Sequence, residues 1–113
     1  MDCLFCKIVS GDIPSERVHE TDTVVAFRDV NPQAPTHVLV IPKQHVESLW
    51  DLEDPVLAGE LLSAASTVAR QEGLEAGWRL IANTRGDGGQ EVLHAHLHVL
   101  GGRPLGRMLS RSN

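Results

Sequence analysis

Four short apolar segments have the pattern of β-strands. Residues 23–27 and residues 37–41 are almost continuously apolar and rich in valine and isoleucine. Residues 37–41 stand between a loop with two prolines and Pro42, a pattern typical of a strand buried on both faces. Residues 78–82 and residues 93–100 are predicted as two further strands, the last closed by two glycines.

One segment has helical periodicity instead. Asp54 is a candidate N-cap, Pro55 stands at the first helical position, and Gly73 is a candidate C-terminal stop. The apolar stripe between them consists of Leu57, Leu61, Leu62, Ala65, Val68 and Ala69. We expect this face of the helix to pack on the sheet. Strands, one long helix and then strands again predict a single α+β domain over residues 1–113, with a mostly antiparallel sheet.

Composition and charge narrow the range of partners. Ten basic and fifteen acidic side chains give a net charge of −5, which argues against a broad nucleic-acid-binding surface. The chain has no apolar run of about 18 residues and no recognisable secretory signal, so we expect no membrane partner and a cytoplasmic location. The two cysteines are then expected to be reduced, which favours a metal-binding or catalytic role over a disulfide.

Three of the six histidines occupy alternate positions of the last predicted strand: His94, His96 and His98. Alternate side chains of a strand point to the same face, so we expect the three imidazoles on one face. The apolar residues between them are expected to pack on the helix. This pattern allows three interpretations: a solvated polar face, a catalytic metal site, or nucleophilic catalysis by an imidazole.

The residues around the three histidines favour catalysis. A glycine-rich turn with Gly86, Gly88 and Gly89 comes just before them, and such turns let backbone N–H groups approach a phosphate closely. His37 opens the buried strand and is a candidate partner for a catalytic imidazole. An anion site beside several imidazoles points to chemistry on a phosphate compound.

Four segments of the chain resemble the histidine-triad (HIT) nucleotide-binding proteins of the Hint-like branch. The most specific is DGGQEVLHAHLHVLGGRPLG. The others are LFCKIVSGDIPSERVHETD, VAFRDVNPQAPTHVLVIPKQH and WRLIANTRGDGGQ, so the resemblance covers nearly the whole chain. It implies a HIT-like fold with one long helix and a short helix, and a sheet that continues across a homodimer. It also implies purine nucleoside phosphoramidase activity on AMP or GMP derivatives.

The resemblance assigns catalytic roles to three histidines. His96 would attack the α-phosphorus and form a nucleotidyl-imidazole that water then hydrolyses. His98 would contact the phosphate or the leaving group, and His37 would orient the nucleophile. No cofactor is required for this chemistry.

The resemblance also implies a nucleotide-binding site. Asp29 would bind the ribose hydroxyls, and Leu4, Phe5, Phe27 and Val30 would form the wall of the base pocket. The implied phosphate site consists of Asn83, Gly89, Gln90, Glu91 and Val92 together with His96 and His98. Many Hint-like members have serine at the position of Glu91, which leaves the proton donor to the leaving group open.

A second site is predicted at Cys3 and Cys6. Two thiolates supply half of a tetrahedral zinc site, and His45 and His94 are the candidate partners. Several bacterial-type family members resemble this pattern and hold a structural zinc. The alternatives are a thioredoxin-like redox motif, which lacks the required βαβ context here, and two half-buried thiols.

Two further functional hypotheses stay open at the level of sequence. One is a metallohydrolase with a zinc-bound hydroxide at the three histidines. The other is a nucleotide-binding or interaction module with little catalysis. By analogy with the Hint-like branch, the tail at residues 104–113 is expected to influence leaving-group selectivity across the dimer.

Overall fold

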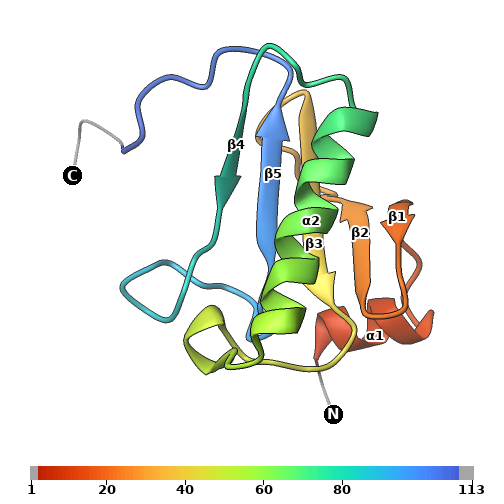
Figure 1. The fold of residues 1–113 in the computed structure, drawn as a ribbon. Helices are drawn as coiled ribbons and strands as arrows, with labels where there is room; N and C mark the ends of the chain where they lie inside the picture. The colour runs from red at the N-terminus through yellow and green to blue at the C-terminus, as the bar shows by residue number, and fades with distance from the viewer. Residues whose placement is uncertain (1–2, 110–113) are drawn as a thin grey trace.

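The continuous apolar run at residues 37–41 is the middle strand of the sheet. The structure, a computed structural model, describes residues 3–109. β3 (Thr36–Pro42) is buried along its whole length. It lies between β2 (Val24–Arg28) and β5 (Leu97–Gly101), with β1 (Arg17–Glu20) and β4 (Trp78–Ile81) at the two edges. All neighbouring strands are antiparallel, and Figure 1 shows the resulting order β1-β2-β3-β5-β4.

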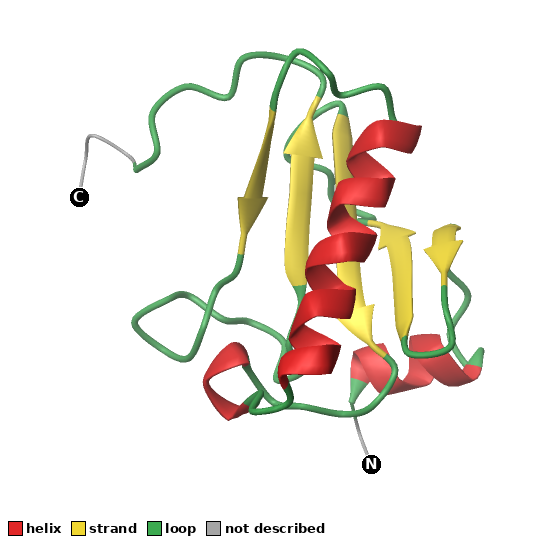
Figure 2. Ribbon diagram, in the orientation of Figure 1, coloured by secondary structure: helices red, strands yellow, loops and turns green. Residues whose placement is uncertain are grey.

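The long helix α2 (Pro55–Gln71) begins and ends where the sequence predicts. The Asp54 side chain accepts a hydrogen bond from the Val56 N–H, and Pro55 occupies the first turn. Gly73 follows the helix with φ +72°, a left-handed conformation that glycine adopts at little cost. The helix lies across one face of the sheet (Figure 2). There its buried stripe meets strand residues in a core of Val24, Ala26, Val38, Val40, Leu61, Ala64, Ala65, Val68, Ala69, Leu74, Leu97 and Val99.

The short helix α1 (Leu4–Ser10) packs on the opposite face of the sheet. Its Phe5 and Ile8 are buried against Val25, Leu39 and Ile41. The Cys3 sulfur accepts a hydrogen bond from the Cys6 N–H at the start of this helix, at 3.3 Å. The sheet is therefore covered by α2 on one face and partly by α1 on the other.

Three elements were not located by sequence periodicity, and one of them is α1, which only the family resemblance implied. β1 is a four-residue edge strand, and the 3-10 turn η1 (Leu49–Asp51) precedes α2. Within residues 3–109 no helix is both long and apolar enough to cross a membrane. Of the tail that was predicted to influence selectivity, residues 110–113 lie outside the described part of the chain.

Candidate functional site

The prediction of a strand over residues 93–100 is wrong for its first four residues. β5 begins at Leu97, so only His98 of the three alternate histidines lies on a strand. The opposing Pro42 has no N–H with which to continue the ladder. Instead, the Ala95 N–H donates to the Val46 carbonyl at 2.6 Å and the His94 N–H to the Val92 carbonyl. This change of backbone direction separates His94 from the other two histidines.

A cavity of about 470 Å³ opens on the sheet face opposite α2 and contains most of the predicted site. Its lining residues are Phe5, Asp29, Asn31, Gln33, His37, Leu39, Asn83, Gly89, Glu91, Val92, His96 and His98. Nine of these twelve were predicted from the sequence. Asn31, Gln33 and Leu39 were not, and the first two come from the proline-containing loop before β3.

Four predicted nucleotide-binding residues are not among the residues that line this cavity. Phe27 is 4% exposed and packs edge-on against Phe5, with 5.6 Å between the ring centroids. Leu4 and Val30 are on the surface, at 46% and 90% exposure. The Gln90 side chain hydrogen-bonds to the backbone of its own loop and of residue 47.

A chain of hydrogen bonds fixes the tautomers of His37 and His98. Nδ1 of His37 accepts the Gln33 N–H at 3.0 Å, so the proton of the neutral ring is on Nε2. That Nε2 lies 2.9 Å from Nδ1 of His98 and donates to it. His98 then carries its own proton on Nε2. Asp29 Oδ2, at 3.5 Å from Nε2 of His37, favours the same arrangement.

His96 has the opposite tautomer. Its Nδ1 lies 2.7 Å from the His94 carbonyl oxygen, which only accepts, so Nδ1 carries the proton. Nε2 of the neutral ring is therefore bare. The ring is 7% exposed and is held edge-on by Phe5 at 5.1 Å between centroids. The bare nitrogen of His96 and the N–H of His98 belong to rings whose centroids are 5.1 Å apart in one cavity.

Burial keeps the paired imidazoles uncharged near neutral pH. Burial lowers the pKa of His98 to about 4, and repulsion from the protonated forms of His96 and then His37 adds to this shift. Burial also lowers the pKa of His37, although the Asp29 carboxylate opposes this shift. Both rings are therefore neutral at pH 7, as the tautomer assignment requires.

The glycine-rich turn forms a tight loop at the mouth of the cavity. The Asn83 side-chain amide donates to the Gly88 carbonyl at 2.7 Å. A Cβ at Gly88 would lie 2.4 Å from the Thr84 carbonyl oxygen, so only glycine fits there. Gly89 has φ +77°. The loop backbone at Gly89, Glu91 and Val92 lies at the cavity with Asn83.

The second predicted site also comes together in the fold. The ligand atoms of Cys3, Cys6, His45 and His94 lie within 4.8 Å of one another. Nδ1 of His94 is 3.3 Å from the Cys3 sulfur, 3.6 Å from the Cys6 sulfur and 3.3 Å from Nδ1 of His45. A tetrahedral zinc ion holds nitrogen and sulfur ligands about 3.3–3.8 Å apart, so the spacing fits this metal. We call these four residues the Cys/His cluster.

The tautomer of His94 also fits a metal ligand. Its Nε2 donates to the Pro42 carbonyl at 2.8 Å, which leaves Nδ1 bare and directed at the two thiols. Burial lowers the pKa of His94, which is fully buried, and so favours the neutral ring that binds metals. Burial, followed by the neighbouring Cys3 thiol, raises the pKa of Cys6 as long as no cation is bound.

Comparisons with known proteins agree with one another. A family model described as HIT domain matches residues 10–105. The chain is 48% identical to the purine nucleoside phosphoramidase of Escherichia coli K12 over 112 residues, which cover 96% of this chain and 94% of that protein.

Solved structures give the same result. The HIT family hydrolase of Legionella pneumophila Philadelphia 1 superposes with a TM-score of 0.90 at 49% identity, covering 93% of this chain and 96% of that one. A histidine triad protein from Clostridium difficile superposes with a TM-score of 0.91 at 45% identity, covering 96% of this chain and 97% of that one.

Proposed function

The chain belongs to the HIT domain family, and on that premise we propose that it hydrolyses nucleoside 5′-phosphoramidates. The relative from Escherichia coli is named for this activity on purine nucleosides. The observation that carries the proposal is the pair of opposite tautomers in one cavity: a bare Nε2 on His96 beside a protonated Nε2 on His98.

The reaction proceeds in two steps. Nε2 of His96 attacks the α-phosphorus, the P–N bond breaks, and the amine leaves after taking up a proton from solvent, which the water of the second step replaces. The resulting nucleotidyl-imidazole is then hydrolysed by water, which returns His96 to its neutral form and releases the nucleoside monophosphate. The Nε2–H of His98 donates to a phosphoryl oxygen or to the leaving group, where charge develops. His37 holds His98 in this tautomer.

The cavity supplies groups for each part of the nucleotide. Oδ1 of Asp29 accepts the Asn31 N–H at 2.8 Å, and we assign its other oxygen to the ribose hydroxyls. Asn83 and the backbone of Gly89, Glu91 and Val92 bind the phosphate oxygens. Phe5 provides the buried wall beside the base, and Leu4 and Val30 are exposed apolar residues available to cover the base from outside.

We assign a structural zinc ion to the Cys/His cluster. The bound metal would join the start of α1, the segment after β3 and the segment before β5. It takes no part in the proposed reaction, because the bare nitrogen of His96 belongs to the cavity and not to the cluster. Two thiols that bind zinc must stay reduced, which a reducing compartment favours, so we also propose a cytoplasmic location.

The test is hydrolysis of adenosine 5′-phosphoramidate and its guanosine counterpart, with and without a strong chelator, with circular dichroism on each sample. We expect turnover in every sample whose circular dichroism shows an intact fold, with or without the chelator. Loss of turnover in chelator with an intact fold would favour the metallohydrolase with a zinc-bound hydroxide at the three histidines. Nucleotide binding with negligible turnover in every sample would favour the binding module.

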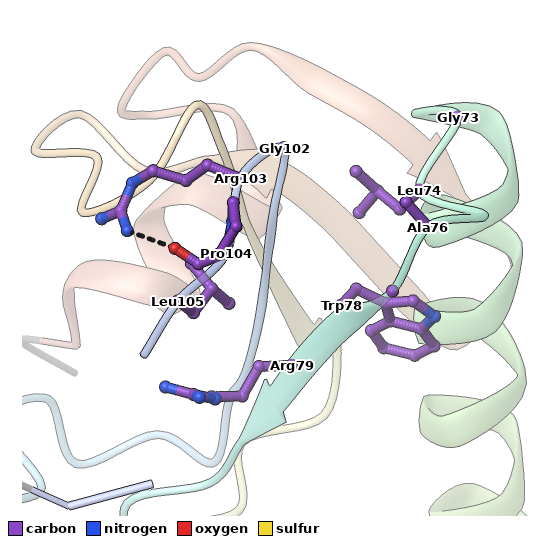
Figure 3. Close-up of a pocket in the computed structure, with 10 residues that line it drawn as sticks. Gly73, Leu74, Ala76, Trp78, Arg79, Gly102, Arg103, Pro104 and Leu105 are labelled. Carbon is purple, nitrogen blue, oxygen red and sulfur yellow. Dashed lines mark hydrogen bonds between the residues drawn. The ribbon is translucent and has the colours of Figure 1, made fainter. Parts of the chain in front are cut away.

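We also propose a homodimer through β4. This strand has β5 on one side and is an edge strand on the other. Beside it lies a groove of about 580 Å³, with Trp78 and Leu74 on one side and Arg103, Pro104 and Leu105 on the other (Figure 3). Trp78 is 38% exposed and Met108 in the tail 84% exposed. Sedimentation analysis should give a dimer for the unmodified chain and a monomer for Trp78→Glu.

A further inference from the structure

The side chain of Gln90 does not share the orientation of its neighbours in the glycine-rich loop. Gly89 and Glu91 line the cavity, whereas the Gln90 amide hydrogen-bonds to the backbone on the other side. Its Oε1 accepts the Arg85 N–H at 2.8 Å. Its Nε2 donates to the Glu47 carbonyl at 2.6 Å and to the Val92 carbonyl at 2.9 Å.

These three bonds close the loop at both of its ends. The Gln90 N–H donates to the Arg85 carbonyl at 3.1 Å, so Arg85 and Gln90 are joined by two bonds, one from the backbone and one from the side chain. Arg85 has φ +58°, an unfavourable conformation for a residue with a side chain. The bond from its N–H to Oε1 of Gln90 helps to hold that conformation.

The bond from Nε2 of Gln90 to the Glu47 carbonyl connects the loop to the segment after β3. This segment is also bonded to the chain just before the nucleophile, because the Val46 carbonyl accepts the Ala95 N–H at 2.6 Å. Residues 46 and 47 therefore hold the loop on one side and the His94–His96 segment on the other. This pair of contacts is one of the constraints on the distance between the loop and His96, beside the bond from the His94 N–H to the Val92 carbonyl.

We propose that Gln90 is a positioning residue for the phosphoramidase reaction, holding the phosphate-binding loop in register with His96 without touching the substrate. This inference rests on the proposed function, because it concerns the same reaction. A loop that already has its final conformation before the substrate binds stabilises developing charge without having to rearrange during the reaction. Small displacements of such groups reduce the rate strongly, whereas ground-state binding tolerates them.

Two variants test the proposal. Gln90→Met keeps the length of the side chain and removes all three bonds; Gln90→Glu keeps the acceptor for the Arg85 N–H and removes both donors. Each is expected to lower kcat for adenosine 5′-phosphoramidate about 10- to 100-fold, with KM changed by less than about threefold. Gln71→Glu, the same chemical change at the exposed end of α2, is expected to behave like the unmodified chain.

Amide hydrogen exchange gives a readout that is independent of turnover. The Arg85 amide should exchange about tenfold faster in Gln90→Met, while amides of β3 stay protected. Unchanged kcat in both variants would overturn the proposal. A rise in KM as large as the fall in kcat, or global unfolding of the variants, would overturn it too. An unmodified chain that shows no turnover while the Arg85 amide is protected would instead contradict the proposed function.

Discussion

His94 and His96 are two residues apart, yet their rings serve different sites. In His94 the backbone carbonyl of Pro42 binds Nε2–H and leaves Nδ1 facing two thiols. In His96 the carbonyl of His94 binds Nδ1–H and leaves Nε2 facing the cavity. Under the proposed function, the same side chain is a metal ligand in one case and a nucleophile in the other, because a different ring nitrogen meets a carbonyl oxygen.

The two sites also differ in what they require of their surroundings. The Cys/His cluster joins three segments of chain, so its loss should reduce the stability of the fold. The cavity holds neutral imidazoles in defined tautomers, so its loss should reduce turnover and leave the fold in place. Substitutions in the two sites should therefore separate stability from activity.

The largest effect is expected for His96→Gly. Removing the nucleophile should lower kcat by about 10⁴-fold or more, as loss of a nucleophile does in other covalent enzymes. AMP affinity should change by less than tenfold, and circular dichroism should match the unmodified chain. Activity within tenfold of the unmodified chain would remove His96 from the mechanism.

Next in size is the double substitution Cys3→Ser with Cys6→Ser. It should abolish zinc binding and lower the free energy of unfolding by about 4 kcal/mol when zinc is present at 1,000 times its Kd. Chelator should destabilise the unmodified chain by the same amount and leave the double variant unchanged. Equal stability of both proteins in zinc, measured by urea denaturation, would mean that the cluster binds no stabilising metal.

A smaller effect on activity alone is expected for Asp29→Asn. The amide oxygen still accepts the Asn31 N–H, but the charge beside His37 and the ribose is lost. Loss of a charged hydrogen-bond acceptor should lower kcat/KM about 10- to 100-fold, with the melting temperature nearly unchanged. Asp22→Asn, at an exposed turn before β2, is the matched control. Equal kcat/KM in the two variants would show that Asp29 only caps its own turn.

The last effect appears only in acid and is a pH dependence of stability from His98. Its pKa is lowered to about 4 in the fold, against about 6.5 in the unfolded chain. The unfolded chain therefore binds the extra proton between these values, and this contribution to stability is lost as pH falls from about 6.5 to 4. In urea denaturation, the free energy of unfolding of His98→Asn should fall less steeply between these two pH values than that of the unmodified chain. Parallel declines would contradict the assignment.

Much of the fold was predictable because its signals are local. The N-cap at Asp54, the stop at Gly73 and the continuous apolar run of β3 each specify an element through a few neighbouring residues. The start of β5 was predicted wrongly because it depends on Pro42, a residue of the opposing strand. Strand β1 was missed because four residues at a sheet edge carry little pattern.

The candidate site was likewise predictable where side-chain patterns signal it, and was missed where backbone groups or packing decide. The four members of the Cys/His cluster were predicted to come together, and they do; bound zinc stays a prediction. Gln33 was missed because it acts through its backbone N–H, which no side-chain pattern signals. Phe27 was predicted as a pocket wall, but it packs edge-on against Phe5 and is not among the residues that line the cavity.

In the proposed reaction His96, and neither of its two alternate neighbours, bonds to the substrate. The most direct test mixes the protein with adenosine 5′-phosphoramidate, stops the reaction in alkali within milliseconds, and locates any nucleotidyl adduct by peptide mass spectrometry. We expect an adduct on His96 that forms and decays as fast as turnover. Turnover with no adduct, or an adduct on His94 or His98, would contradict it.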